Sequence, residues 1–329
     1  MLNPYFNEEH NMLREQVRRF VENEIVPNGE AWEEDGCVPR EILRKMGELG
    51  FLGLTHAEQY GGSGMDVRGA VVLAEELSRS TFAGVTITAL VHTNMASPHL
   101  ANAGSAEQKQ KYLPDIIAGK KITAICVTEP GAGSDVAGIR TRAVKDGNDW
   151  VINGSKIFIT NGVYGDIYFV AAKTDPEAKG SRGISIFIVE KGAKGFSVGR
   201  SLKKHGWRSS DTAELFFDDV RVPQENMLGE RNKGFYAVMK NFQHERIMLA
   251  AMGVGEAQKA FELTLEHVKT RKAFGAALFD KDIIREKLAR MQTKIALARN
   301  YLHYVAWLDA QGVDCIKEVS MLKANACEI

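Results

Sequence analysis

The sequence contains little cysteine, and the few cysteines are scattered. The four of them are Cys37, Cys126, Cys315 and Cys327. None stands in a CxxC pair, and four in a chain of 329 residues cannot form the framework of a disulfide-stabilised domain. We therefore expect free thiols and a reducing compartment.

Metal-ligand patterns and long apolar runs are also missing. The eight histidines include no HExxH or similar spacing, so we predict no metal site. The longest apolar stretches, Ala83–Val91 and Ile247–Gly255, reach only half of the about 18 residues that cross a bilayer. No membrane span is therefore predicted. The first residues, MLNPYFNEEHNMLREQ, are acidic and mixed, so we expect no signal or transit peptide.

Neither sign of charge is in excess. Lys plus Arg and Asp plus Glu both number 42, which gives a net charge of zero. Lys and Arg form no clustered stripe, so binding to nucleic acid is disfavoured. The hydrophobic share of 44% and the charged share of 26% are those of an ordinary globular protein, which excludes disorder as the main state.

Helical patterns fill residues 1–120. Apolar residues recur at three- and four-residue steps near the start of the chain, which is typical of one face of a helix: Leu13, Val17, Phe20, Val21 and Ile25. Three more helices are predicted over Pro39–Gly50, Asp66–Ser80 and Ser105–Ala118. Ser105 and Gln108 have the spacing of a capping box.

Residues 121–230 have the pattern of short strands separated by Gly, Asn and Asp turns. The predicted strands are Ile122–Val127, Trp150–Thr160, Ile167–Lys173, Gly183–Glu190 and Ala213–Val220. Because no helical pattern lies between them, they indicate an antiparallel sandwich or barrel rather than βαβ units.

Helical patterns return over residues 231–329. We predict helices over Lys233–Gly253, Glu256–Lys272 and about 282–311. The last stretch, Asp314–Ile329, is still helical in pattern where the sequence stops, so we expect a C-terminal helical domain that is truncated. The predicted organisation is three domains, 1–120, 121–230 and 231–329.

The segment Cys126–Asp135, with the sequence CVTEPGAGSD, follows a predicted strand and holds two glycines two residues apart. Glycines there let a ligand approach the backbone N–H groups closely. The pattern is not GxGxxG and no helical pattern follows, so a Rossmann site is disfavoured. An ordinary glycine turn between strands explains the local pattern equally well.

A second candidate segment is Phe158–Gly162, FITNG, which ends a strand at a turn. Its aromatic ring and hydroxyl have the chemistry to pack against a flat ring system. A strand end with a core Phe is the plainer explanation.

The third segment is QHER, which spans Gln243–Arg246. Helical steps place Glu245 on an apolar stripe with Val238, Phe242, Leu249 and Met252. No basic residue stands three or four positions from Glu245, so burial is predicted to raise the pKa of this carboxyl, as in a general base. An ion pair with an Arg from another element is the alternative.

The fourth segment, Thr270–Gly275 or TRKAFG, lies between two predicted helices. Arg271 could hold a phosphate and Phe274 could stack on a ring. A basic helix C-terminus closed by Gly275 is the structural alternative.

Together these segments, with SSDTAELFFDDVRVP at 209–223, resemble the acyl-CoA dehydrogenase family over nearly the whole chain. The resemblance implies a multidomain α+β fold: a helical N-terminal domain, a central antiparallel β-barrel and a C-terminal helical bundle. It also implies an FAD cofactor, an acyl-CoA substrate, an electron-transferring flavoprotein as partner, a homodimer or homotetramer, and a role in fatty-acid β-oxidation. The implied location is the bacterial cytoplasm or the mitochondrial matrix.

The resemblance assigns roles by position. The residues implied to line the flavin are Val127, Thr128, Gly133, Ser134, Phe158, Ile159 and Thr160, with Arg271 and Phe274 reaching the FAD of a neighbouring subunit. Ser134, Gln243 and Arg246 are implied to face the substrate. Glu245 matches the catalytic base of the long-chain and isovaleryl-type branch, which removes the α-proton of the thioester.

Three other functions stay open at this level. An acyl-CoA oxidase would pass its electrons to oxygen, although such chains are usually longer. A nucleic-acid-binding flavoprotein of the same superfamily is disfavoured by the balanced charge. An inactive structural fragment would lack flavin.

Overall fold

The computed structural model describes residues 4–178 and 180–329. Along the chain, helices come first, a group of strands follows, and helices end the sequence. The backbone packs into two compact units, each built from separate stretches of chain. We call residues up to 28, 65–86 and 245–329 the helical unit, and residues 29–64 and 87–244 the sheet unit. The prediction of three domains in chain order stays a prediction.

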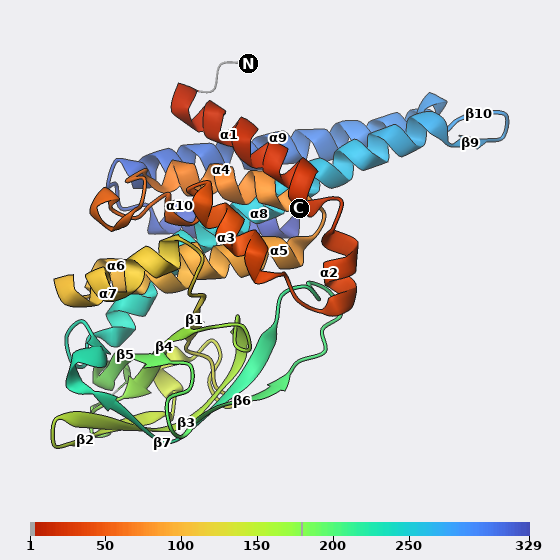
Figure 1. Ribbon diagram of the computed structural model, residues 1–329. Helices are drawn as coiled ribbons and strands as arrows, with labels where there is room; N and C mark the ends of the chain where they lie inside the picture. The colour runs from red at the N-terminus through yellow and green to blue at the C-terminus, as the bar shows by residue number, and fades with distance from the viewer. Residues whose placement is uncertain (1–3, 179) are drawn as a thin grey trace. The chain divides into compact units, whose positions relative to one another are not determined.

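The helical unit consists of helices and one short hairpin (Figure 1). Its elements are α1 (Glu8–Phe20), α4 (Val67–Ser78), the part of α8 (Gly234–Thr270) after residue 244, β9 (Lys272–Ala273), β10 (Ala276–Ala277), α9 (Asp282–Ala310) and α10 (Ile316–Glu328). The predicted apolar face of α1 is buried at Leu13, Val17 and Phe20. The predicted start of α4 is also confirmed, because the Asp66 side chain accepts from Arg68 N and so caps the helix.

Two predicted helices, Lys233–Gly253 and Glu256–Lys272, form the single helix α8, Gly234–Thr270. The glycines between them therefore do not end a helix. A Cβ on Gly255 would lie 2.4 Å from Glu75 O on α4, and one on Gly253 would lie 3.0 Å from Ala326 O on α10. These glycines let neighbouring helices approach the α8 backbone. From the sequence alone, they resemble helix-breaking residues, because the packing partners are not visible there.

Gly255→Ala tests this interpretation. At an open helix position, replacing Gly by Ala would raise the free energy of unfolding by about 1 kcal/mol, because Ala has the higher helix propensity. Here we expect a loss of about 1–3 kcal/mol, because the new methyl overlaps the Glu75 carbonyl. Urea unfolding measures the difference. Gly253→Ala, with a looser contact, is the control and should be close to neutral; equal effects would contradict the packing role.

A buried ion cluster joins the helices of the helical unit. The Glu75 carboxylate, on α4, accepts from Arg14 at 2.8 Å, from Arg299 at 3.2 Å and from His303 Nε2 at 3.2 Å. Its side chain is 1% exposed. Burial alone would raise the pKa of Glu75, but the hydrogen bond and charge of His303, with the charges of Arg14 and Arg299, hold that pKa well below its ordinary value. Glu75 therefore connects α4 to α1 and α9.

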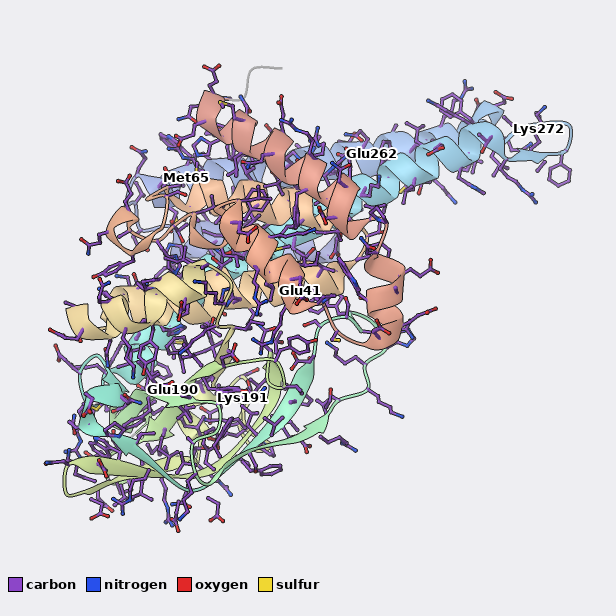
Figure 2. The ribbon with its side chains drawn as sticks, viewed as in Figure 1. Glu41, Met65, Glu190, Lys191, Glu262 and Lys272 are labelled. Atoms are coloured by element: carbon purple, nitrogen blue, oxygen red, sulfur yellow. The ribbon has the colours of Figure 1, made fainter. Side chains whose placement is uncertain are left out.

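The α8–α9 pair extends to an exposed tip. Figure 1 shows α8 and α9 running side by side to the β9–β10 turn, where β9 and β10 pair in antiparallel register. Lys272, labelled in Figure 2, lies on β9. We call residues 271–277 the arm tip.

The sheet unit carries all of the remaining strands. They are β1 (Thr123–Cys126), β2 (Arg142–Asp146), β3 (Asp149–Thr160), β4 (Ile167–Lys173), β5 (Ile184–Glu190), β6 (Phe196–Ser201), β7 (Thr212–Pro223) and β8 (Met227–Leu228). Its helices are α2 (Gly29–Asp35), α3 (Arg40–Glu48), α6 (Ser97–Ala103) and α7 (Ala106–Ile117), with part of α5 (Ala83–Leu90) and of α8. The predicted capping box of α7 is present, with Ser105 N donating to Gln108 Oε1 at 2.9 Å.

The eight strands of the sheet unit form one sheet with the order β6-β7-β3-β2-β4-β5-β8, and β1 pairs with β4. Within the described residues β6 and β8 are the two ends of this order, so the sheet is not closed and the predicted barrel is too strong a description. Most pairs are antiparallel, as predicted, but β1 and β2 each run parallel to β4. The intervening β2–β3 hairpin returns the chain to β4 in that direction.

The sheet is buried on both faces. Phe169 on β4 and Ile188 on β5 pack with Leu113 of α7 on one face. Tyr168 and Val189, their neighbours in sequence, pack on the other face. Because side chains alternate along a strand, burial on both faces requires a continuous apolar run, which both strands have in the sequence.

Candidate active site

The loop after β1 has an open, glycine-rich surface. Val127 is buried, while Gly131, Gly133 and Ser134 are exposed. A Cβ added to Gly131 or Gly133 would meet no atom within 4 Å, so crowding inside the protein does not require glycine there. A short 3₁₀ turn, Val136–Gly138, follows. The loop therefore offers free space in front of its backbone and is not the helix start of a Rossmann fold.

A bulge in β3 turns Phe158 outward. The pairing of β3 with β7 shifts register between Lys156 and Ile159, and Phe158 has a φ of 60°. Such a φ is strained for an aromatic residue and is typical of functional sites. Phe158 is 63% exposed, whereas Ile159 is 3% exposed. The ring of Phe158 is thus a flat apolar surface at the end of the strand.

The loop and the bulge lie together. Ile157 N donates to Thr128 O at 3.0 Å, which joins the residue before Phe158 to the loop. Asn161, just after the bulge, donates from Nδ2 to Thr88 O at 3.2 Å and to Thr123 O at 3.1 Å. Within the sheet unit, the structure therefore joins the start of the 127–134 segment to the strand end that carries residues 158–160.

The third segment lies in the middle of α8. Gln243 belongs to the sheet unit, and Glu245 and Arg246 belong to the helical unit. All three side chains are half-buried. Val238 and Met252 on the predicted stripe are buried. Glu245 is not without a partner in the structure. The predicted rise in the pKa of Glu245 stays a prediction.

A second acid on α8 was missed by the sequence analysis. Glu256 stands 11 residues after Glu245, which at 100° per residue returns to nearly the same face about 16 Å further along the helix. Its Oε1 is buried and has no hydrogen-bond partner among the described residues. Burial raises the pKa of Glu256. Its spacing of eleven residues from Glu245, which places both acids on nearly the same helix face, was the sequence feature that could have identified it.

The arm tip presents the fourth segment to solvent. Phe274 is 98% exposed with a φ of 54°, and Lys281 Nζ lies 5.3 Å from its ring centroid. Arg271 is exposed, and its carbonyl accepts from Leu278 N at 2.9 Å. The arm tip therefore holds an aromatic ring and a guanidinium that the helical unit leaves uncovered.

Three family models match successive parts of the chain. They are the acyl-CoA dehydrogenase N-terminal domain over residues 7–120, the middle domain over 124–220 and the C-terminal domain over 232–329. The chain belongs to the acyl-CoA dehydrogenase family. The family predicted from the motifs is confirmed.

Individual relatives agree with this family. The chain is 45% identical over 298 residues to a mitochondrial long-chain specific acyl-CoA dehydrogenase of Sus scrofa, covering 90% of this chain and 69% of the relative. It is 44% identical to a solved acyl-CoA dehydrogenase from Geobacillus kaustophilus, with a TM-score of 0.93 over 98% of this chain and 84% of the other. A solved FAD complex of PigA matches with 27% identity and a TM-score of 0.95, covering 99% and 85%.

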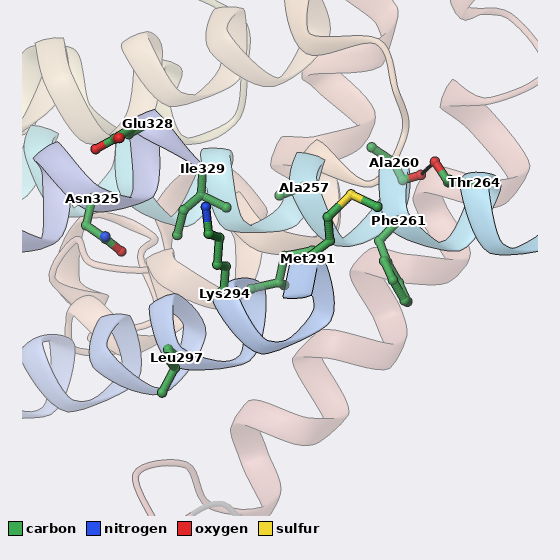
Figure 3. Close-up of a pocket in the computed structure, with 11 residues that line it drawn as sticks. Ala257, Ala260, Phe261, Thr264, Met291, Lys294, Leu297, Asn325, Glu328 and Ile329 are labelled. Atoms are coloured by element: carbon green, nitrogen blue, oxygen red, sulfur yellow. Dashed lines mark hydrogen bonds between the residues drawn. The ribbon is translucent and has the colours of Figure 1, made fainter. Parts of the chain in front are cut away.

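The helical unit also contains a mostly apolar pocket of about 410 Å³ (Figure 3). Phe261 of α8, Met291 and Leu297 of α9, and Ile329 at the chain end lie around it. None of the predicted site residues lines this pocket.

The described residues offer neither a metal-binding cluster nor a membrane-spanning helix. Within residues 4–178 and 180–329, no three His, Cys, Asp or Glu side chains gather in a way that could hold a metal ion. Over the same residues, no helix is both long and apolar enough to cross a bilayer.

Proposed function

We propose that this protein is an FAD-dependent acyl-CoA dehydrogenase that converts an acyl-CoA thioester to the trans-2-enoyl-CoA. The observation that carries the proposal is the exposed Phe158 ring on the β3 bulge, next to Ile157, whose N–H donates to Thr128 O of the open loop after β1. A flat apolar ring and the backbone of an uncrowded glycine loop fit a flavin, which has an aromatic face and hydrogen-bonding edges.

The residues present fit FAD chemically. The loop supplies backbone N–H groups and the Thr128 and Ser134 hydroxyls, while Phe158, Ile159 and Thr160 supply a strand end on which the ring could lie. FAD, when bound, accepts the β-hydrogen of the substrate as a hydride. Val127 and Gly133 complete the proposed flavin contacts.

Glu245 is proposed to remove the α-proton of the thioester. An α-proton next to a thioester carbonyl is weakly acidic, so the reaction needs a well-placed base and hydrogen bonds to the carbonyl oxygen, each contributing about 3–4 kcal/mol. The half-buried environment of Glu245 limits solvation of its carboxylate, which favours proton transfer. Gln243, Arg246 and Ser134 are proposed to face the CoA thioester.

The arm tip is proposed to complete the FAD site of a neighbouring subunit in a dimer or tetramer. The support is that Arg271 and Phe274 are exposed. A guanidinium fits a phosphate, and an aromatic ring fits a flat base.

Phe274→Ala is expected to weaken FAD retention about tenfold or more, because the ring would be buried on the cofactor. The unfolding temperature of the flavin-free protein should not change, since the ring is exposed in the chain. Flavin absorbance per protein after gel filtration measures retention. Met12→Ala, which removes another exposed apolar side chain, should retain FAD normally; loss of FAD in both variants would refute a specific role of the arm tip.

Turnover on acyl-CoA thioesters is the direct test of the proposed function. The purified protein should be yellow, oxidise acyl-CoA and reduce a dye acceptor. We propose a long-chain or branched acyl group, an electron-transferring flavoprotein as acceptor, and the cytoplasm or mitochondrial matrix as the location. Turnover across a panel of chain lengths and branched analogues identifies the substrate. A yellow protein that reduces only oxygen would be an oxidase instead, and one that oxidises no acyl-CoA would overturn the proposal.

A further inference from the structure

One lysine of the sheet unit is completely buried. The side chain of Lys156, on β3, has 0% exposure. A buried ammonium loses its hydration, so it must find acceptors within the protein. Its Nζ donates to Val127 O at 2.9 Å and to Glu129 Oε1 at 2.8 Å. Both acceptors belong to the open loop after β1, so Lys156 ties β3 directly to that loop.

Glu129 joins the two ends of the same loop. Its Oε2 accepts from Arg140 N at 2.5 Å and its Oε1 accepts from Thr141 N at 3.0 Å. Burial alone would raise the pKa of Glu129, but the charge and hydrogen bond of Lys156 and these N–H groups hold that pKa below its ordinary value. The carboxylate is therefore ionised at neutral pH and closes the loop from residue 129 to residue 141.

Lys156 also stands where the β3 bulge begins. The register shift starts at Lys156, Phe158 turns outward two residues later, and Ile157 N donates to Thr128 O. The strand segment that presents Phe158 is thus bonded to the loop residues Val127, Thr128 and Glu129 in succession. A well-packed apolar residue in place of a buried ion pair is often as stable or more stable, so stability alone does not explain this arrangement.

We propose that Lys156 is a positioning residue that, through Val127 and Glu129, holds the 127–134 loop in register with Phe158–Thr160 so that both parts of the flavin face are presented together. The inference rests on the proposed function, because it requires FAD to lie on this face. It makes Lys156 part of cofactor binding without contact between its side chain and the cofactor.

Lys156→Met tests the proposal, since it keeps the length of the side chain and removes its charge and donors. The purified protein, stripped of flavin, is titrated with FAD and followed by flavin fluorescence and absorbance. We expect the Kd for FAD to rise about tenfold or more and the resolved shape of the bound-flavin spectrum to be lost. A purely structural role would lower the unfolding temperature and leave the Kd of the folded protein unchanged.

Tyr112→Phe is the matched control in the sheet unit. It removes the hydrogen bond of 2.7 Å from Tyr112 Oη to Glu190 (labelled in Figure 2), which joins α7 to β5 and involves no residue of the loop. This variant should lose stability and bind FAD like the wild type. If both variants weaken FAD binding equally at equal loss of stability, the positioning role is overturned.

Glu129→Gln tests the same positioning role if Lys156→Met does not fold. Glutamine keeps the volume and one acceptor oxygen but not the charge that holds the ammonium, and we expect a raised Kd for FAD here too. Wild-type FAD binding by a folded Glu129→Gln or Lys156→Met protein overturns the inference and leaves the proposed function intact. A wild-type chain that takes up FAD but oxidises no acyl-CoA overturns the proposed function, while the effect of Lys156 on FAD binding still stands.

Discussion

Glu245→Gln is expected to lower acyl-CoA oxidation by about 10²- to 10⁴-fold, the range that a general base contributes. Glutamine has nearly the same shape but cannot accept the α-proton at neutral pH. The fold and the flavin content should not change, because the predicted flavin contacts of the chain lie elsewhere, in the 127–134 loop, Phe158–Thr160 and the arm tip. Steady-state turnover with a dye acceptor, normalised to bound flavin, measures the effect.

Glu256→Gln is the control for that experiment. Glu256 lies on the same helix, on nearly the same face, and burial raises its pKa. A general effect of removing a half-buried acid from α8 would therefore appear in both variants. We expect Glu256→Gln to keep wild-type turnover. If Glu256→Gln is the inactive variant and Glu245→Gln turns over normally, the base has been assigned to the wrong acid.

Glu75→Gln is expected to destabilise the protein by about 3–5 kcal/mol, the cost of removing one partner of a buried ion pair. Arg14, Arg299 and His303 all contact the carboxylate of Glu75, and glutamine offers the two arginines no negative charge. Denaturant unfolding at neutral pH measures the loss. Glu262→Gln is the matched control: this glutamate pairs with Arg79 at 2.9 Å but is 39% exposed, so its loss should cost less than about 1 kcal/mol.

The pH dependence of this difference follows from the lowered pKa of Glu75. A carboxyl whose folded pKa lies below its ordinary value of 4.5 stabilises the fold fully above that value, and the contribution is lost as pH falls. The gap in stability between wild type and Glu75→Gln should therefore shrink as pH falls below about 4.5. A gap that does not change between pH 7 and pH 3 would contradict the ionised state assigned to Glu75.

Elements with a strong local signal were predictable from the sequence. Strand β4 has the predicted bounds, Ile167–Lys173, because burial on both faces left an uninterrupted apolar run. The start of α7 was equally clear, since Ser105 and Gln108 carry the cap chemistry themselves. In both cases the structure-forming interaction lies within a few residues of the signal.

Elements that depend on distant partners were missed. Strands β2 and β6 have mostly exposed or half-buried residues, so neither shows the apolar pattern that identified β4. The continuity of α8 was also missed. Glycine is needed at position 255 because the Glu75 backbone, far away in the sequence, packs closely against it. The two compact units likewise combine stretches that no local pattern connects.

The candidate site was likewise predictable where the signal is local and not where distant residues meet. The loop 127–134 and the Phe158 segment were found from their residues, and their junction through Ile157 and Thr128 appears only in three dimensions. Lys156 was not singled out, because a lysine in a strand normally indicates a solvent-facing position. Its burial became visible only with Glu129, which is 27 positions away.

Helix α8 has a mechanical consequence. It continues without a break from Glu245 to Thr270, about 38 Å at 1.5 Å per residue, and the arm tip follows directly. A tilt of about 5° around Glu245 would move the far end by about 3 Å over that length. Glu245 and the arm tip are therefore joined by one continuous helix, so a displacement of the tip would change the angle at which this carboxylate is held.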